Sequence, residues 1–207
     1  MSQDQSVRPG INESFNAPVV KEWVERFERE GREVYDKRDE VVAACNISPG
    51  MAVADVGAGT GLFTRLFAQA VGDAGRVYAV DISDEFVDAI VTHADSSGVK
   101  NIRGVVCGVD DAKLPPNSVD VVYICDTYHH FEFPYKTMAS IYKALKPDGR
   151  LVLVDFHRIE GKSSDWIMGH VRAGKDEVQK EVEGVGFKLL EEKPELLTEN
   201  YVLVFGK

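Results

Sequence analysis

The sequence predicts an α/β fold: a Rossmann-like, seven-stranded, mostly parallel sheet with helices on both faces. Three observations predict it. Apolar segments of strand length alternate with helical segments through most of the chain, which is typical of a parallel sheet. A glycine-rich turn joins the first of these strands to the next helix. The last two strand-like segments have no helix between them, so we expect an antiparallel hairpin at one sheet edge and an antiparallel last strand.

Length and charge restrict the class of protein. The 207 residues fit one domain that buries a core without disulfides or structural metals. The net charge of −10 argues against nucleic acid as a partner, because a surface that follows phosphates needs the opposite sign. No segment approaches the roughly 20 apolar residues of a membrane span, and no signal peptide is visible. The three widely spaced cysteines indicate reduced thiols, so we expect a cytoplasmic protein.

The chain divides into two expected parts. Residues 1–45 form an N-terminal arm and helical cap, and residues 46–207 form the sheet domain. Apolar residues recur at helical spacing across 19–44, so we expect helices there that cover the crevice at the sheet edge. Two roles remain open for Trp23 and Phe27: they pack on the sheet, which we favour, or they form a wall around a ligand.

Each element of the sheet domain follows from a local pattern. Apolar runs bounded by turn residues indicate strands, and apolar residues at helical spacing behind capping residues such as Ser83 indicate helices. The expected strands are 51–56, 76–80, 102–107, 119–124, 151–156, 187–190 and 201–205. The expected helices are 60–70, 83–96, 135–145 and 172–184.

The glycine-rich turn after the first strand carries the strongest functional signal. A dinucleotide fingerprint, GxGxxG, that starts at Gly57 requires glycine at position 62, where this chain has Leu62. The third glycine is Gly61, one residue early, and Asp55 precedes the loop by two residues. A GxGxG loop with an acid beside it suits a zwitterionic ligand, because backbone N–H groups donate to a carboxylate while Asp55 favours an ammonium group.

Acidic residues follow the next two strands as well. Asp81 ends the strand at 76–80, where a carboxylate can accept hydrogen bonds from both hydroxyls of a ribose. Asp110 and Asp111 follow the strand at 102–107, where a carboxylate can accept from the exocyclic amine of adenine. The three sites together point to an adenosine-containing ligand at the carboxyl ends of the strands.

These segments resemble the class I S-adenosylmethionine-dependent methyltransferases, and in particular their small-molecule group that includes quinone-biosynthesis enzymes. The segments that carry the resemblance are VADVGAGTG at 53–61, VYAVDI at 77–82, GVDDAKLP at 108–115 with SVDVV at 118–122, and ALKPDGRLV at 144–152. The resemblance implies methyl transfer to a small-molecule acceptor with S-adenosylmethionine as cofactor. It implies a cofactor site formed by Asp55, Gly57, Ala58, Gly59, Gly61, Phe63, Asp81, Ile82 and either Asp110 or Asp111. We add Cys125, which ends the strand at 119–124.

The turn after the fourth strand is expected to face the transferable methyl group. His129 or His130 is the candidate base, because histidine titrates in a suitable range, with Asp126 to orient it and Tyr128 as a polar wall. A structural role for both histidines remains an alternative. The segment that follows the fifth strand is expected to shape the acceptor pocket through His157, Arg158, Trp166, His170 and Arg172.

Other functions remain open at this point. Metal-dependent methyltransferases of the catechol type use a further Asp–Asn pair as metal ligands, and we find no such pair in this sequence. The sequence also lacks a CxxC spacing, so we expect no metal. Methyltransferases that act on nucleic-acid amino groups usually carry Asn/Asp-Pro-Pro-Tyr after the fourth strand, whereas this chain has Cys-Asp-Thr-Tyr at 125–128. A nicotinamide-dependent oxidoreductase and a non-catalytic protein that binds S-adenosylmethionine are the two alternatives.

Overall fold

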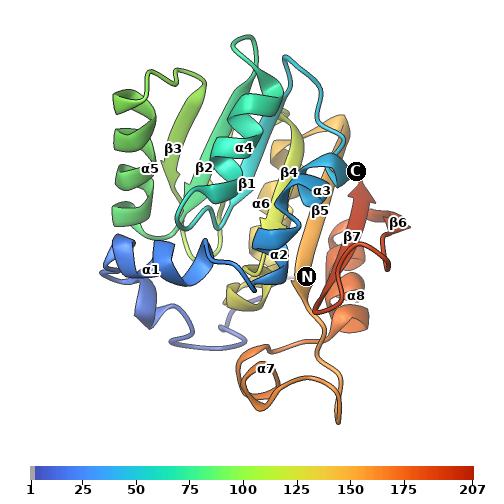
Figure 1. The fold of residues 1–207 in the computed structure, drawn as a ribbon. Helices are drawn as coiled ribbons and strands as arrows, with labels where there is room; N and C mark the ends of the chain where they lie inside the picture. Colours follow the sequence, from blue (N-terminus) through green and yellow to red (C-terminus); the bar gives the residue numbers. More distant parts are fainter. Residues whose placement is uncertain (1–2) are drawn as a thin grey trace.

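The computed structural model describes residues 3–207, and it confirms the expected α/β class. The first two residues of the expected N-terminal arm lie outside the described residues. Seven strands form one sheet in the order β3-β2-β1-β4-β5-β7-β6 (Figure 1). Parallel pairing joins β3, β2, β1, β4 and β5, whereas β7 is antiparallel to both of its neighbours. The expected antiparallel last strand is thus confirmed.

The elements follow the expected alternation closely. The strands are Ala52–Val56 (β1), Arg76–Asp81 (β2), Ile102–Val106 (β3), Val119–Cys125 (β4), Leu145–Phe156 (β5), Lys188–Glu192 (β6) and Asn200–Gly206 (β7). The α-helices are Val20–Phe27 (α1), Glu33–Asp36 (α2), Arg38–Ala44 (α3), Leu62–Val71 (α4), Asp84–Ser96 (α5), Pro134–Ala144 (α6), Asp165–His170 (α7) and Lys175–Val185 (α8). Two 3-10 turns cover Glu13–Phe15 (η1) and Tyr128–His130 (η2).

Helices cover both faces of the sheet. Residues of α6 and α8, such as Met138 and Val182, pack on one face, and residues of α3, α4 and α5, such as Val41, Phe67 and Ile90, pack on the other. Alternate residues of the central strands therefore enter opposite cores, which explains why these strands are apolar along their whole length.

The structure differs from the expected elements in three places. The strand expected at 151–156 begins at Leu145, because residues 145–150 continue the pairing with β4 through an irregular register. The helix expected at 172–184 begins at Lys175, and the short helix α7 precedes it. The expected edge hairpin is present, but its second strand, β7, lies inside the sheet and leaves β6 at the edge.

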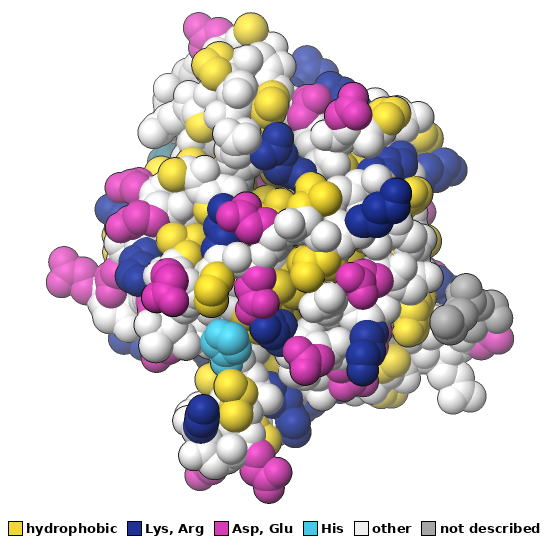
Figure 2. All heavy atoms as spheres, turned by 90° about the vertical axis from the view of Figure 1, so that its right-hand side faces the viewer, with side chains coloured by type: hydrophobic (Ala, Val, Ile, Leu, Met, Phe, Trp, Pro, Cys, Tyr) yellow, Lys and Arg dark blue, Asp and Glu magenta, His cyan; other side chains and the backbone are white. Residues whose placement is uncertain are grey.

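The surface on the β6 side carries mixed charge. Figure 2 shows the side of the molecule that lies on the right of Figure 1, and acidic and basic side chains are interspersed there without a continuous basic area. Leu190 of β6 is 65% exposed, as a residue on an edge strand can be. Among the described residues, no helix has both the length and the apolar composition that a membrane crossing requires.

Candidate active site

The glycine loop lies between β1 and α4, at the end of the sheet where the parallel strands terminate (Figure 1). Its backbone N–H groups at Gly57 and Ala58 donate to the Val80 carbonyl at 2.8 and 3.1 Å, which fixes the loop against the end of β2. Gly57 has φ +77°, and a Cβ there would overlap the Thr127 side chain. The left-handed conformation and the close approach together explain why glycine occupies position 57.

Two buried carboxylates flank this loop. Asp55 accepts a hydrogen bond from Thr64 Oγ1 at 2.6 Å, and burial raises its pKa to about 7 against the opposing effect of that bond. Asp81 accepts from the backbone N–H groups of Gly59 at 2.8 Å and Ser83 at 3.0 Å, while its burial raises its pKa. Asp55 has no cationic side-chain partner among the described ion pairs, so a ligand ammonium group suits its position.

One cavity of about 480 Å³ connects the loop with the acceptor side. This volume lies in the range of small-molecule sites. Most of the expected cofactor residues line it: Asp55, Gly57, Ala58, Gly59, Phe63, Asp81, Ile82 and Cys125. His129 and His130 line the same cavity, so the structure brings the two expected halves of the site together.

Three of the expected cofactor residues are not among those that line the cavity. Gly61 lies behind the loop, where a Cβ would approach Ile90 Cγ1 to 2.7 Å, so its place is set by packing against α5. The half-buried Asp110 faces Lys136 at 3.7 Å, and the exposed Asp111 accepts from the Lys113 N–H at 2.7 Å. The segment reaches the cavity through other residues, namely Cys107, Gly108, Val109 and Ala112.

His129 is held by a carboxylate that the sequence did not single out. Its Nδ1 lies 2.7 Å from Asp155 Oδ1, and its backbone N–H donates to Asp155 Oδ2 at 3.1 Å. Burial alone would lower the pKa of His129, but Asp155 outweighs it, so the pKa is raised. Asp155 is the penultimate residue of β5, which lies beside β4, so its carboxylate reaches the turn that carries the two histidines. The sequence signal that could have identified Asp155 was an acidic residue near the end of the strand that neighbours β4.

Asp126 and Tyr128 occupy positions other than the expected ones. Asp126 does not orient a histidine, because its carboxylate accepts from Arg32 at 2.5 Å and from Asn200 at 2.6 Å. Tyr128 is fully buried, its hydroxyl donates to Glu181 at 2.9 Å, and it is not among the residues that line the cavity. Of the four residues expected in the turn after β4, His129, His130 and Asp126 line the cavity.

The Arg32–Asp126 ion pair joins the start of α2 to the turn after β4. We expect Arg32→Ala to lower the free energy of unfolding by about 2 kcal/mol, because it leaves a largely buried carboxylate without its cation. Arg29→Ala, an exposed arginine of the same segment, is the matched control and is expected to change little. Urea unfolding of both variants measures the difference, and equal stabilities would contradict this role.

Aromatic side chains from the N-terminal region cover the cavity. Phe15, Trp23 and Phe27 all line it, with ring centroids 5.0 Å apart in each successive pair, and the Trp23 ring also meets Phe86 of α5. The role that we favoured from the sequence, packing of Trp23 and Phe27 on the sheet, is therefore incomplete. Both rings form part of the cavity wall.

The segment after β5 supplies only part of what was expected. Trp166 and His170 line the cavity, and their rings stack with centroids 4.7 Å apart. His157, Arg158 and Arg172 are not among the lining residues. Arg172 forms a bidentate pair with Glu181, at 2.8 and 2.7 Å, behind the acceptor turn. These two groups support the turn from within the core.

Comparison with known proteins agrees with this geometry. Residues 54–153 match the model of a family described as a methyltransferase domain. The ubiquinone/menaquinone biosynthesis C-methyltransferase UbiE of Hydrogenovibrio crunogenus is 31% identical over 114 residues, which are 55% of this chain and 45% of that protein. The UbiE of Burkholderia vietnamiensis is 29% identical over 118 residues, 57% of this chain and 48% of that protein.

The chain is thus similar to methyltransferases over residues 54–153, in line with the resemblance found in the sequence. It spans about half the length of the curated relatives that it matches. A methyltransferase structure from Aquifex aeolicus has the same fold, with a TM-score of 0.77 and 23% identity over 89% of this chain and 96% of that one. The [4+2]-cyclase SpnF also has this fold, with a TM-score of 0.68 and 20% identity over 80% of this chain and 63% of that one. The fold by itself thus does not define the reaction.

Proposed function

We propose that this protein transfers a methyl group from S-adenosylmethionine to a small-molecule acceptor and releases S-adenosylhomocysteine. The observation that carries the proposal is the single cavity that joins the glycine loop, Asp55 and Asp81 to a histidine-containing turn. The UbiE relatives support an acceptor of the quinone-biosynthesis kind, with an aromatic ring. The three free cysteines suit a reducing compartment, so the proposal places the protein in the cytoplasm.

The residues that line the loop side fit the cofactor. Asp55 would hold the methionine ammonium group, and the backbone N–H groups of the loop would face its carboxylate. Asp81, at the end of β2, would accept hydrogen bonds from the ribose. The bound cofactor would supply an electrophilic methyl group on a sulfonium. The aromatic wall of Phe15, Trp23 and Phe27 would exclude water from it.

The residues on the opposite side would position and activate the acceptor. His129 is the candidate base, because Asp155 binds its Nδ1 and thereby leaves Nε2 free to take a proton from the acceptor. His130 and Trp166 would form the neighbouring walls. Of the two histidines proposed from the sequence, His129 is the better oriented, since His130 Nδ1 is buried without a hydrogen-bond partner.

Asp55 makes cofactor binding depend on protons. The raised pKa of about 7 means that part of the population carries a neutral Asp55 at pH 7. A ligand ammonium group lowers this pKa again, so we expect binding at pH 7 to release protons from Asp55. Calorimetry in buffers with different ionisation enthalpies measures the number released. Asp55→Asn is expected to remove that release, and an unchanged number in the variant would contradict the assignment.

The same shift has a consequence for stability. Because the folded-state pKa of Asp55 lies above the unfolded value of about 4, the neutral acid is the form that folding favours. The stability that Asp55 contributes is therefore complete below about pH 4 and declines as the pH rises through about 7. We expect the unfolding free energy of Asp55→Asn, measured without cofactor as a function of pH, to lack the part of the decline that is due to Asp55.

The function is tested in two steps. Calorimetry with S-adenosylmethionine and S-adenosylhomocysteine measures binding, and a methyl-labelled cofactor with a panel of hydroxylated aromatic acceptors measures transfer. Binding together with a labelled product is the expected result. Tighter binding of NADH than of S-adenosylhomocysteine would instead favour the nicotinamide-dependent oxidoreductase. Cofactor binding without any labelled product would favour a non-catalytic binding protein or a reaction of another kind, such as that of the [4+2]-cyclase SpnF.

A further inference from the structure

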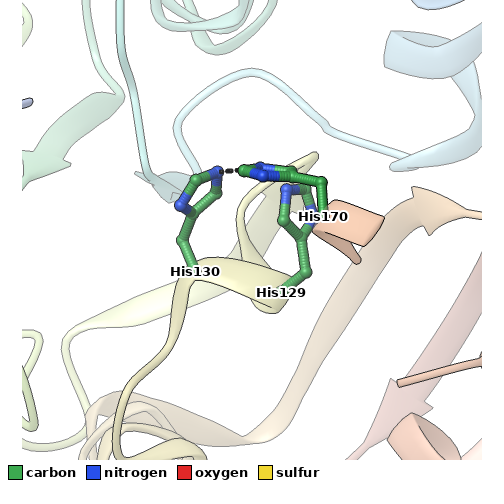
Figure 3. Close-up of side chains that lie close together, drawn as sticks. All are labelled: His129, His130 and His170. Atoms are coloured by element: carbon green, nitrogen blue, oxygen red, sulfur yellow. Dashed lines mark hydrogen bonds between the residues drawn. The ribbon is translucent and has the colours of Figure 1, made fainter. Parts of the chain in front are cut away.

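Three histidines from two distant segments meet on the acceptor side of the cavity. His129 and His130 belong to the turn η2, and His170 ends the helix α7. Figure 3 shows the three rings turned toward one another, with His130 Nε2 and His170 Nε2 3.4 Å apart. One ring nitrogen from each residue lies within 4.8 Å of the other two. Such a group is a possible set of metal ligands.

The pKa values of two of these rings are lowered, whereas Asp155 raises the pKa of His129. Burial, and after it the neighbouring His129 and His170, lower the pKa of His130 to about 3. Burial and His129 also lower the pKa of His170. Both rings are therefore neutral near pH 7, and neutral imidazole nitrogens are the form that binds metal ions. The two nitrogens lie 3.4 Å apart, so an ion bound to both would sit to one side of the line that joins them.

The separation between His130 and His170 agrees with a tetrahedral site. Metal–nitrogen bonds of about 2.0–2.1 Å at a tetrahedral ion place two nitrogens about 3.3 Å apart. The His130–His170 separation of 3.4 Å is close to this value. Asp155 binds His129 Nδ1 at 2.7 Å, which directs Nε2 of that ring away from the carboxylate. A carboxylate behind a histidine ligand is the usual outer partner in such sites, because it fixes the tautomer and raises the basicity of the ring.

We propose that His129, His130 and His170 bind a divalent transition-metal ion, with zinc-like preference for nitrogen ligands, and leave one coordination position open to the cavity. The proposed metal binding rests only on these histidines, whereas a role of the metal in methyl transfer rests on the proposed function. An acceptor hydroxyl at the open position would have a lowered pKa, so it would lose its proton to water and the metal would take over the role proposed for His129. The proposal departs from our expectation of no metal, because the position of His170 beside the turn is a tertiary feature.

Cobalt(II) titration of the chelator-treated protein without a histidine tag tests the site in the absence of cofactor. We expect one ion per chain, with the intense visible absorption of tetrahedral cobalt, and competition by zinc. His170→Ala is the first variant, because its side chain is only partly buried and its loss should spare the fold. We expect it to weaken binding by at least about 10-fold, since it removes one of three ligands. The matched control is His93→Ala, an exposed histidine on α5, which should bind cobalt like the wild type.

A second variant tests the outer partner. Asp155→Asn is expected to weaken metal binding by about 10- to 100-fold, as is typical when the partner of a histidine ligand is changed. Circular dichroism and S-adenosylhomocysteine binding of both variants, which should match the wild type, report whether fold and cofactor site are intact. Equal cobalt affinity of the wild type and His170→Ala, or absence of the tetrahedral absorption in the wild type, would overturn the metal site and leave the proposed methyl transfer untouched.

Discussion

The Asp81→Ala variant is expected to bind S-adenosylhomocysteine about 100- to 1000-fold more weakly than the wild type. A carboxylate at the end of β2 can accept from both ribose hydroxyls, and hydrogen bonds to a charged group contribute about 1.5–3 kcal/mol each. The substitution also removes the acceptor of the Gly59 N–H, which Asp81 binds at 2.8 Å. The substitution therefore removes the carboxylate that accepts from both the glycine loop and the ribose. Calorimetry of wild type and variant measures the change.

Asp81→Asn and Asp84→Ala complete this experiment. The asparagine keeps one oxygen for the Gly59 N–H but loses the charge, so we expect an intermediate affinity. Asp84 lies three residues further along the chain, exposed in the first turn of α5, and its loss should leave cofactor affinity unchanged. Undiminished binding by Asp81→Ala would show that the ribose is held elsewhere and would remove the central support of the proposed function.

The Gly57→Ala variant is expected to lose measurable cofactor binding and about 2–5 kcal/mol of unfolding free energy. Its φ of +77° is unfavourable for alanine, and its Cβ would overlap the Thr127 side chain at the end of β4. The backbone at this point donates to Val80 and lines the cavity, so a displaced loop changes the surface that faces the cofactor. Calorimetry and urea unfolding measure the two effects.

Gly50→Ala separates the two causes. Gly50 has φ +87°, similar to Gly57, but no atom lies within 4 Å of the Cβ that alanine would add. This control thus carries only the cost of the left-handed conformation, about 1–2 kcal/mol, and should bind the cofactor normally. If both variants lost the same stability and neither lost binding, close packing against Thr127 would have no part in shaping the loop.

The sequence predicted the features that local patterns determine. All seven strands, the reversed direction of the last one and the helices from α4 to α6 follow from periodicity and turn residues, which depend on neighbours in the chain. The glycine loop with Asp55 and Asp81 was likewise found from spacing, and the structure places these residues around one cavity. The position of β7 inside the sheet was not foreseen, because a hairpin pattern does not say which strand pairs with β5.

The features that tertiary contacts determine were missed. Asp155 and His129 are 26 residues apart and meet only because β5 lies beside β4. Asp126 was assigned to the histidine because the two are close in sequence. In the structure Asp126 lies in a turn with φ +49°, and its carboxylate accepts hydrogen bonds from Arg32 and Asn200. His170 approaches His130 through a helix of six residues, too short for a periodic signal.

The helix that carries two rings of the cavity wall is only weakly anchored. The helix α1, which carries Trp23 and Phe27, has no fully buried residue, whereas the strands beneath it are buried almost throughout. Segments with so little burial open locally at a free-energy cost far below that of global unfolding. Ligand exchange can therefore proceed through transient release of α1 while the sheet stays intact. The rate of cofactor association would then report the opening equilibrium of one eight-residue helix rather than diffusion alone.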